Sequence, residues 1–400
     1  MATKTTQTGK AGSNGAHPVA GQQGLPGQIV LVLQGGGALG AYQVGVYEAL
    51  HEAGIEPDWV IGTSIGAINA ALIAGNAPEY RLERLREFWA RMEQGSSTDL
   101  LSLFTGLSNM SANMATVTRG IPAFFTPNPI AWLSAHTPLG IEKAAYYTTA
   151  PLRETLSDLV DLEHCNEHGI RLTVGAVNAR NGEMRYFDSR DEHVGIDHIL
   201  ASGALPPAFP AIRIDGDPYW DGGIYSNTPI EAVLDDKPRR DSVIFTVHMW
   251  NPDGPEPESL WQVMGRQKDI QYASRSKSHI ARQQQIHHLR HVIRELSKEL
   301  PEKLRNSPKA RELASWGCGT TMHVARLVAP KLVGEDHTKD IDFTPAGIRA
   351  RWKEGYADTR RMIERAPWKA PVDPTVGVVI HDPVAHGRRG AIGNAGNKMR

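Results

Sequence analysis

A short, continuous apolar run opens the regular part of the chain. Residues 28–33 read Gln-Ile-Val-Leu-Val-Leu, which is typical of a strand buried on both faces of a parallel sheet. Three glycines follow, and from residue 38 to about residue 53 the apolar positions recur at helical spacing. Residues 58–61 predict a second strand, and small residues at 65–74 predict a second helix. Because strand and helix alternate, we expect a three-layer α/β/α fold around a central, mostly parallel sheet.

The same patterns predict the later elements of this fold. Amphipathic helices are expected at residues 79–92 and 344–363, and strands at 171–177, 183–188, 242–247 and 321–328. Asn181-Gly182 and Asp215-Gly216 are dipeptides typical of tight turns, so each is expected to join two antiparallel strands. Residues 255–316 are rich in Gln, Arg, Lys, His and Leu, which predicts an insertion of long surface helices.

The two ends of the chain differ from the middle in composition. Residues 1–27 are rich in Gly, Thr, Gln and Ala, and residues 367–400 are rich in Gly and Pro with little that can be buried. Segments of this kind cannot form a packed core, so we expect a disordered leader and a disordered tail. Residues 28–366 are then expected to form one domain that includes the helical insertion.

Composition excludes several classes of function. The 43 basic and 44 acidic residues nearly cancel, whereas a nucleic-acid-binding protein is expected to carry a basic excess. Cys165 and Cys318 are far apart in the sequence, so neither a disulfide framework nor a zinc site is indicated, and a reducing compartment fits best. Because no membrane-spanning run and no secretory signal is found, we expect a cytoplasmic protein.

The turn between the second strand and the second helix carries a serine. Gly62-Thr63-Ser64-Ile65-Gly66 fits G-x-S-x-G, the nucleophile elbow of serine hydrolases, and a predicted strand and helix flank it as that motif requires. The glycines are needed because the serine occupies a tight, strained turn with no room for side chains beside it. The alternative is a plain glycine-rich turn, but the flanking elements favour a nucleophilic Ser64.

The glycine run after the first strand has two competing interpretations. Gly35-Gly36-Gly37-Ala38-Leu39-Gly40 opens a helix, so its backbone N–H groups form a site for an anion. As a dinucleotide fingerprint it would need a ribose-binding acid at the end of the second strand, whereas Asp58 begins that strand and Glu56 precedes it. As an oxyanion hole, it lies one strand from Ser64, where a carbonyl oxygen would become negative, and we favour this second interpretation.

A serine nucleophile also needs a base. The chain has 16 histidines, and chain order permits a triad of Ser64, Asp221 and His248. The elbow of an α/β-hydrolase, however, normally follows several strands, whereas this one follows the second. The better candidate is Asp221 in Trp220-Asp221-Gly222-Gly223, a carboxylate on a glycine-rich turn directly after a strand. Taken alone, this segment also fits an ordinary Asp-Gly turn.

Taken together, residues 35–40, 62–66 and 221–223 resemble the motifs of the patatin-like phospholipases, which are serine lipid acyl hydrolases, and the Pro-rich stretch 202–210 is similar to the block before their aspartate. The resemblance covers about residues 28–247 and implies a Ser-Asp dyad without histidine, metal or other cofactor. It implies that Ser64 attacks an ester carbonyl, that Asp221 takes its proton, and that the oxyanion hole and motif glycines are Gly35, Gly36, Gly37, Gly40, Gly62, Gly66, Gly222 and Gly223.

The resemblance leaves the substrate open. The family commonly has a basic residue where this chain has Leu39, so phospholipid is the default substrate class while neutral esters, lysolipids and hydroxyacyl polyesters stay possible. Residues 101–140 contain Arg119 as their single Asp, Glu, Lys or Arg and many apolar side chains, which favours a lid or acyl pocket over an irregular loop that fills the core. Candidate residues for that role are Phe104, Phe124, Phe125 and Trp132.

The helical insertion is the most basic part of the sequence. Its basic residues include Arg266, Lys268, Arg275, Lys277, Arg282, Arg290, Arg294 and Lys298, with His287, His288 and His291 among them. Such a surface is suited to peripheral contact with an anionic membrane, but we favour the alternative of a solvated helical face or an oligomer contact. The histidines are a weak metal signal because no carboxylate accompanies them.

Other functions stay open beside the lipid acyl hydrolase. An acyltransferase or thioesterase would use the same serine elbow, and we expect it to pair the serine with a histidine. A non-catalytic, membrane-peripheral lipid-binding module would retain the fold alone, and a nucleotide-binding oxidoreductase would use the glycine run. The sequence does not specify the head group, the acyl length or the oligomeric state.

Overall fold

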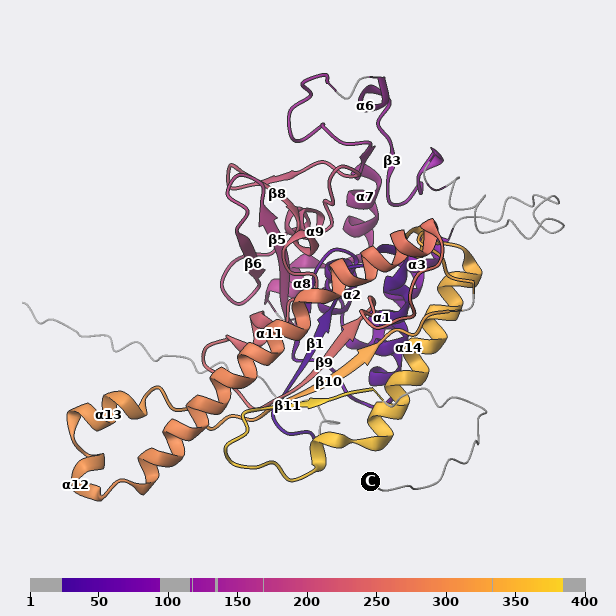
Figure 1. The fold of residues 1–400 in the computed structure, drawn as a ribbon. Coiled ribbons are helices and arrows are strands. Elements are labelled where there is room, and N and C mark those ends of the chain that lie inside the picture. The colour runs from indigo at the N-terminus through magenta and orange to yellow at the C-terminus, as the bar shows by residue number, and fades with distance from the viewer. Residues whose placement is uncertain are drawn as a thin grey trace, which may run out of the picture.

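The computed structural model describes residues 24–93, 116, 118–133, 136–167, 169–332 and 334–383 (Figure 1). Most strands in these residues form one sheet with the spatial order β11-β10-β9-β1-β2-β5-β8-β7, and β6 pairs with the other edge of β5. The neighbours from β11 to β5 are parallel, whereas β6, β7 and β8 pair antiparallel. The sheet is therefore mostly parallel, as expected.

The strands lie close to their predicted positions. Their bounds are β1 Gln28–Leu33, β2 Trp59–Gly62, β5 Arg171–Asn178, β6 Met184–Asp188, β7 Ile212–Ile214, β8 Asp217–Asp221, β9 Ser242–His248, β10 Met322–Val328 and β11 Val378–His381. The hairpin turns at Asn181-Gly182 and Asp215-Gly216 join β5 to β6 and β7 to β8, which confirms both turn predictions. A separate short ribbon pairs β3 Thr126–Pro127 with β4 Tyr147–Thr148.

Helices cover both faces of the sheet. The larger apolar cluster includes Leu31 of β1 and packs under α1 Ala41–Glu52, α2 Ile65–Ala74, α3 Pro78–Met92 and α14 Pro345–Arg365. The neighbouring Val30 and Val32 point into a second cluster with residues of α10 Glu231–Leu234 and α11 Leu260–Glu299. Alternate residues of one strand thus enter different cores, which explains why β1 is apolar throughout.

Several short elements complete the described chain. They are α6 Pro129–Leu133, α7 Ala150–Leu159, α8 Leu162–Glu167, α9 Ile196–Ser202, α12 Glu302–Arg305, α13 Pro308–Ala314, and the 3₁₀ turns η1 Gly37–Gly40, η2 Gly222–Ile224, η3 Lys339–Ile341 and η4 Pro367–Lys369. None of the helices within the described ranges is both long and apolar enough to cross a bilayer.

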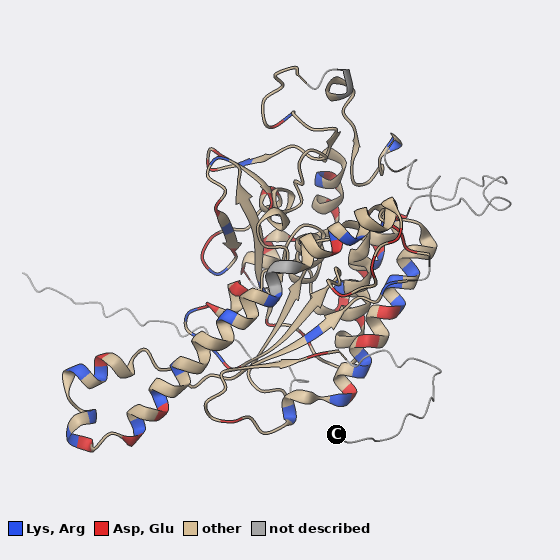
Figure 2. Ribbon diagram, in the orientation of Figure 1, with Lys and Arg blue, Asp and Glu red and all other residues tan. Residues whose placement is uncertain are grey.

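The helical segment 255–316 consists largely of α11, α12 and α13. The far half of α11 projects from the body with α12 and α13 at its tip (Figure 1). The other half is more than a surface helix, because Ala273 and Ile280 are buried against the body. Figure 2 shows that basic and acidic residues alternate along the ribbon of the projecting part, so this part is not uniformly basic.

The expectation of a disordered tail from residue 367 onward is wrong for residues 367–383. Trp368 is buried against Phe245 with ring centroids 5.5 Å apart, and β11 forms an edge strand beside β10. The apolar run Val378-Val379-Ile380 carries this strand, and it was obscured by the Gly and Pro residues around it. Residues 384–400 and 1–23 lie outside the described residues, so those parts of the prediction stay untested.

Candidate active site

Ser64 lies on a strained turn between β2 and α2. Its φ of 57° and ψ of −127° place it in the left-handed region that L-residues rarely adopt. The Ser64 amide donates to the carbonyl oxygen of Ser202 at 3.1 Å and to its Oγ at 3.0 Å. The Ser202 hydroxyl in turn donates to the carbonyl of Gly175 at 2.6 Å. Hydrogen bonds to α9 and β5 therefore hold the serine in its strained conformation.

The elbow glycines are required by close backbone contacts. A Cβ added to Gly62 would lie 2.2 Å from the carbonyl oxygen of Gly66, and one added to Gly66 would lie 2.3 Å from that of Leu33. Both distances are far below van der Waals contact, and a backbone neighbour cannot rotate away as a side chain can. The structure thus gives both motif glycines a steric role in closing the turn.

The glycine run lies directly beside Ser64. A Cβ on Gly35 would lie 3.0 Å from the Cβ of Ser64, one on Gly37 would lie 2.3 Å from the carbonyl oxygen of Asp340, and one on Gly40 would meet the side chain of Ile65. The amide of Gly35 donates to the carbonyl of Asn227 at 3.2 Å, so this amide is already engaged. Of the three candidate oxyanion donors, Gly36 and Gly37 are therefore the better ones.

Asn227 and Trp250 fix the position of the glycine run. Their Nδ2 and Nε1 atoms donate to the carbonyl oxygen of Gly35 at 3.1 and 2.8 Å. A Cβ on Gly223 would lie only 2.8 Å from Asn227 Oδ1, so the same side chain also adjoins the turn after Asp221. Asn227 is buried and connects the glycine run with the aspartate turn.

Gln34 is a second polar residue that sequence reasoning missed. Its fully buried side chain accepts hydrogen bonds from the amides of Met249 and Trp250 at 2.5 and 3.1 Å. It donates to Thr228 Oγ1 at 2.7 Å and to the Tyr272 carbonyl at 3.3 Å. The sequence points to this role of Gln34 only by placing a glutamine between an apolar strand and three glycines. The hydrogen-bond partners of its side chain lie about 200 positions away and form no local pattern with it.

Asp221 ends β8 and caps η2, and it lies against Ser64. The carboxylate is buried and accepts a hydrogen bond from the Gly223 amide at 2.7 Å, and the Ser64 side chain lies close enough to lower its pKa. Burial nevertheless raises the pKa of Asp221 to about 7, because Ser64 and the Gly223 amide only partly oppose the loss of hydration. A Cβ on Gly222 would lie 2.4 Å from the carbonyl oxygen of Gly175, so the turn packs tightly on β5.

His248 and the candidate ribose-binding acids have other partners. The His248 ring is buried and its Nε2 lies 3.1 Å from Thr246 Oγ1, and burial lowers the pKa of His248 to about 3. Ser64 lies close to Asp221, and among the described residues no hydrogen bond joins Ser64 to the His248 ring. Asp58 accepts from the Ile29 amide at 2.8 Å and Glu56 pairs with Arg81 at 2.6 Å, so both acids stabilise the fold.

An aromatic cluster lies at the end of the Pro-rich segment 202–210. Phe124 and Phe125 are largely buried and pack on Phe209 with ring centroids 6.0 and 5.3 Å apart, and Phe125 also contacts Tyr147 at 4.9 Å. The segment reaches the dyad through Ala204, whose carbonyl accepts from the Asp221 amide at 3.0 Å. Phe104 lies outside the described residues, and Trp132 is described in its backbone only.

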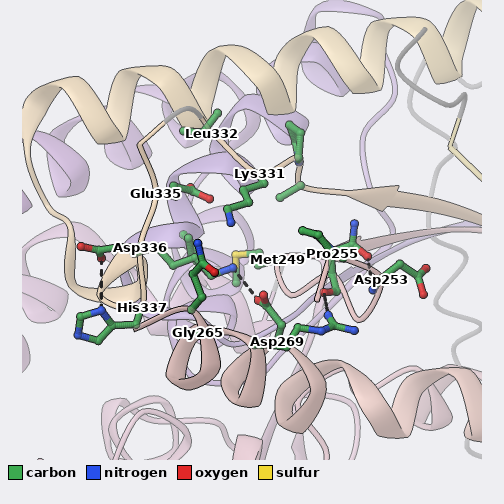
Figure 3. A pocket seen from close by; sticks show the side chains of 18 of the residues that line it. Met249, Asp253, Pro255, Gly265, Asp269, Lys331, Leu332, Glu335, Asp336 and His337 are labelled. Carbon is green, nitrogen blue, oxygen red and sulfur yellow. Dashed lines mark hydrogen bonds and ion pairs between the residues drawn. The ribbon is translucent and has the colours of Figure 1, made fainter. Parts of the chain in front are cut away.

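A cavity lies beside the glycine run rather than at Ser64 and Asp221. It has a volume of about 580 Å³, and its lining includes Leu39 and Met249 but neither Ser64 nor Asp221 (Figure 3). Some charged groups in its wall are paired within the protein, such as Lys339 with Asp269 at 2.6 Å.

The histidines of α11 bind backbone carbonyls. His287 contacts Leu234 at 3.1 Å, His288 contacts Thr375 at 2.8 Å, and His291 contacts Pro374 and Thr320 at 2.8 and 2.9 Å. His288 and His291 attach the segment before β11 to the helix, His291 also binds the residues before β10, and His287 binds α10. In the part of the chain that the structure describes, no three His, Cys, Asp or Glu side chains form a group that could hold a metal ion.

Comparisons with known proteins agree with this geometry. A family model described as "Patatin-like phospholipase" matches residues 31–234, and a second one, described as "Patatin phospholipase", matches residues 270–375. Relatives include lysophospholipase NTE1 of Candida glabrata, 26% identical over 60% of this chain and 12% of its own length. A cGAMP-activated phospholipase of Pseudomonas aeruginosa is 28% identical over 52% of this chain and 55% of its own.

A mammalian relative gives a shorter match. Patatin-like phospholipase domain-containing protein 6 of Homo sapiens is 38% identical over 22% of this chain and 6% of its own length. The chain therefore spans only part of each of these curated relatives, from 6% to 55% of their length.

Proposed function

Because the chain belongs to the patatin-like phospholipase family, we propose that it hydrolyses carboxylic esters of lipids through a dyad of Ser64 and Asp221. The observation that carries this proposal is that a strained serine lies close to a buried carboxylate with a raised pKa. Ser64 and Asp221 are far apart in the sequence. Because burying an acid costs free energy, a buried acid beside a serine indicates a functional role.

In the proposed reaction, Ser64 Oγ attacks the ester carbonyl while its proton passes to Asp221. The amides of Gly36 and Gly37 donate to the oxygen that becomes negative, and the N-terminus of α2 favours the same charge. When the tetrahedral intermediate collapses, Asp221 returns the proton to the leaving alcohol and an acyl-serine remains. Water then attacks the acyl carbonyl while Asp221 takes its proton. As the second tetrahedral intermediate collapses, the bond to Ser64 Oγ breaks, Asp221 returns the proton to that oxygen, and the fatty acid leaves.

The raised pKa suits Asp221 to this exchange. An ordinary carboxylate is too weak a base to deprotonate a serine, whereas one with a pKa of about 7 holds a transferred proton more strongly. It can still release that proton near neutral pH. Burial thus tunes one group to act first as base and then as acid.

Apolar residues near the dyad support a lipid substrate. We propose that Phe124 and Phe125, which touch Phe209 at the end of the segment from Ala204, line the acyl site or form its lid. Leu39 is buried and puts no cation beside the glycine run, so we infer that substrate recognition relies on the acyl chain more than on an anionic head group. Lysophospholipids, the substrates named in several relatives, are the first class to examine.

We extend the proposal to the setting of the enzyme. Residues 28–366 with β11 act as one catalytic domain, and the chain works in the cytoplasm in peripheral contact with a membrane through the helices of 255–316. A transferase or thioesterase that uses the same elbow is the second candidate, because Ser64 would form the same acyl-enzyme. The two differ in whether water or a second substrate accepts the acyl group.

The test compares hydrolysis of a medium-chain p-nitrophenyl ester and of lysophosphatidylcholine by wild type, Ser64→Ala and Asp221→Asn. Matched controls are Ser157→Ala, at an exposed position of α7, and Asp217→Asn, at a partly exposed position on the same strand as Asp221. With folding checked by circular dichroism, we expect both site variants to lose at least about a thousandfold in kcat and both controls to keep full activity. Retained activity in Ser64→Ala would refute the proposal, and retained activity in Asp221→Asn would place the base elsewhere.

A further inference from the structure

The first three turns of α11 present an uncharged face to solvent. Its residues follow the spacing i, i+3, i+4, i+7, i+10 and i+11, which places them on about one third of the helix circumference. All of them are exposed and none is charged, and we call this set the outer face of α11: Leu260, Val263, Met264, Gln267, Ile270 and Gln271. Four of the six are large apolar side chains, between 39% and 71% exposed, so the face is an apolar patch and not a scatter of single residues.

Charged residues at the borders of this face are bound within the protein. Lys268 pairs with Asp340 at 2.8 Å and Asp269 pairs with Lys339 at 2.6 Å. Arg266 donates to the carbonyl oxygens of Pro252 and Asn251. Arg266 and Lys268 were expected to contribute to a basic membrane-binding surface, but Lys268 has a carboxylate partner, Arg266 binds backbone carbonyls, and Asp269 is itself an acid paired with a lysine. The surface around the outer face is therefore close to neutral.

The opposite side of the same turns touches the catalytic machinery. The backbone carbonyl of Tyr272 lies 3.3 Å from Gln34 Nε2 and 3.5 Å from Asn227 Nδ2, the two buried residues that hold the glycine run. The Tyr272 ring packs on Trp250 at 4.9 Å, and Ala273 is buried. One helix therefore separates the outer face from the residues next to Ser64.

A second exposed apolar group lies beside Asp221. Ile224 and Tyr225, which follow the aspartate turn, are 43% and 47% exposed. Apolar side chains thus reach the surface both from the helix that covers the glycine run and from the turn that carries the proposed base.

We propose that the outer face of α11 docks the enzyme on the surface of a neutral, zwitterionic phospholipid layer. This inference rests on the proposed function, since it explains how a site for lipid esters meets a substrate that is packed in a layer. An amphipathic helix lies in such an interface with its apolar side buried at the boundary of head groups and acyl chains. Because the charges at the borders of the outer face are balanced, they give no preference for anionic lipid. We therefore expect the outer face to bind lipid through apolar contact.

The test measures binding of the full chain to extruded vesicles of phosphatidylcholine by cosedimentation. Ser64→Ala serves as background, so that the vesicles stay intact. We expect Val263→Glu with Ile270→Glu to weaken binding at least about tenfold, because each charge would have to enter the apolar boundary. The matched control is Leu289→Glu with Leu296→Glu on the projecting half of α11, where both leucines are at least 60% exposed, and we expect it to bind like the parent.

Salt and lipid charge distinguish apolar docking from a basic contact. Raising the salt from 0.15 to 1 M shortens the screening length from about 8 to about 3 Å, which should leave apolar docking unchanged. Binding that requires phosphatidylglycerol and is lost in high salt would overturn the proposal in favour of the basic surface. A dimer of wild type that the outer-face variant dissociates, without an effect on vesicle binding, would assign the face to a second copy of the chain.

Hydrolysis of a soluble short-chain ester separates this proposal from the one on which it rests. With Ser64 intact, the variant Val263→Glu with Ile270→Glu should hydrolyse that ester like wild type. It should lose activity only on vesicles. If wild type hydrolyses no ester, the proposed function fails while vesicle binding can still be measured. If the variant and wild type act equally on vesicles, the docking surface is refuted and the enzyme activity stands.

Discussion

Replacing Asp221 with asparagine is expected to stabilise the folded protein at alkaline pH while it abolishes hydrolysis. Burial raises the pKa of Asp221 from 3.8 to about 7, so the folded state favours the protonated acid. Between these two values the folded chain binds a proton that the unfolded chain has released. Stability therefore falls as pH rises through this window and stays low above about pH 7.

The size of this effect follows from the shift. A change of about three pH units corresponds to about 4 kcal/mol at most, and water penetration and relaxation around the carboxylate reduce it in practice. Asparagine has nearly the same shape and its oxygen can still accept from the Gly223 amide, but it carries no charge to desolvate. We expect the variant to be about 1–3 kcal/mol more stable than wild type at pH 8, and the difference to vanish near pH 4.

Thermal unfolding followed by circular dichroism from pH 4 to 9 measures this difference directly. In wild type, kcat/KM should rise with pH to a plateau above about 7, because the carboxylate must be ionised to accept the serine proton. Asp217→Asn controls for the loss of a surface carboxylate on the same strand. A stability difference between wild type and Asp221→Asn that is the same at every pH would refute the assignment of a raised pKa to this residue.

Three further substitutions probe other parts of the site. Asn227→Ala removes a donor to the Gly35 carbonyl, so kcat should fall about tenfold to a hundredfold with KM little changed, and normal kinetics would show that the glycine run holds its position without it. Gly66→Ala would bring a methyl group 2.3 Å from the Leu33 carbonyl oxygen and should lower the unfolding free energy by more than about 3 kcal/mol, which denaturant titration measures. Phe124→Ala should reduce kcat/KM for long-chain esters about tenfold relative to short-chain esters, and an equal effect on both would exclude Phe124 from the acyl site.

Local patterns were sufficient to predict most of the fold. The apolar run of β1 and the Asn181-Gly182 and Asp215-Gly216 turns each depend on neighbours within a few positions, and the structure confirms all three. The segment after residue 367 shows where local patterns fail. The short run Val378-Val379-Ile380 becomes a strand only because β10 offers an open edge and histidines of α11 bind the preceding loop.

The site was predictable only where its residues form motifs. Ser64, Asp221 and the glycines carry recognisable spacing, whereas Gln34 and Asn227 carry none. These two residues matter because their partners, Trp250 and Tyr272, come from distant segments that the fold brings to the glycine run. A side chain that is defined by long-range hydrogen bonds leaves no periodic signal in the sequence.

The glycine run is the place where the two halves of the chain depend on each other. One matched family region, 31–234, supplies Ser64, the glycines and Asp221, and the other, 270–375, supplies the Tyr272 carbonyl and the Asp340 backbone that packs against Gly37. Ser64 is strained and Asp221 is desolvated, so the site tends to relax unless its surroundings oppose this. Hydrogen bonds from Ser202 oppose this within the first region, and the Tyr272 carbonyl and the Asp340 backbone add contacts from the second. The helix that carries Tyr272 also carries the outer face proposed to meet lipid. The proposed active site and the proposed lipid-binding face therefore lie on opposite sides of α11, so changes to the outer face are expected to affect lipid contact while the Tyr272 side keeps its bonds to the glycine run.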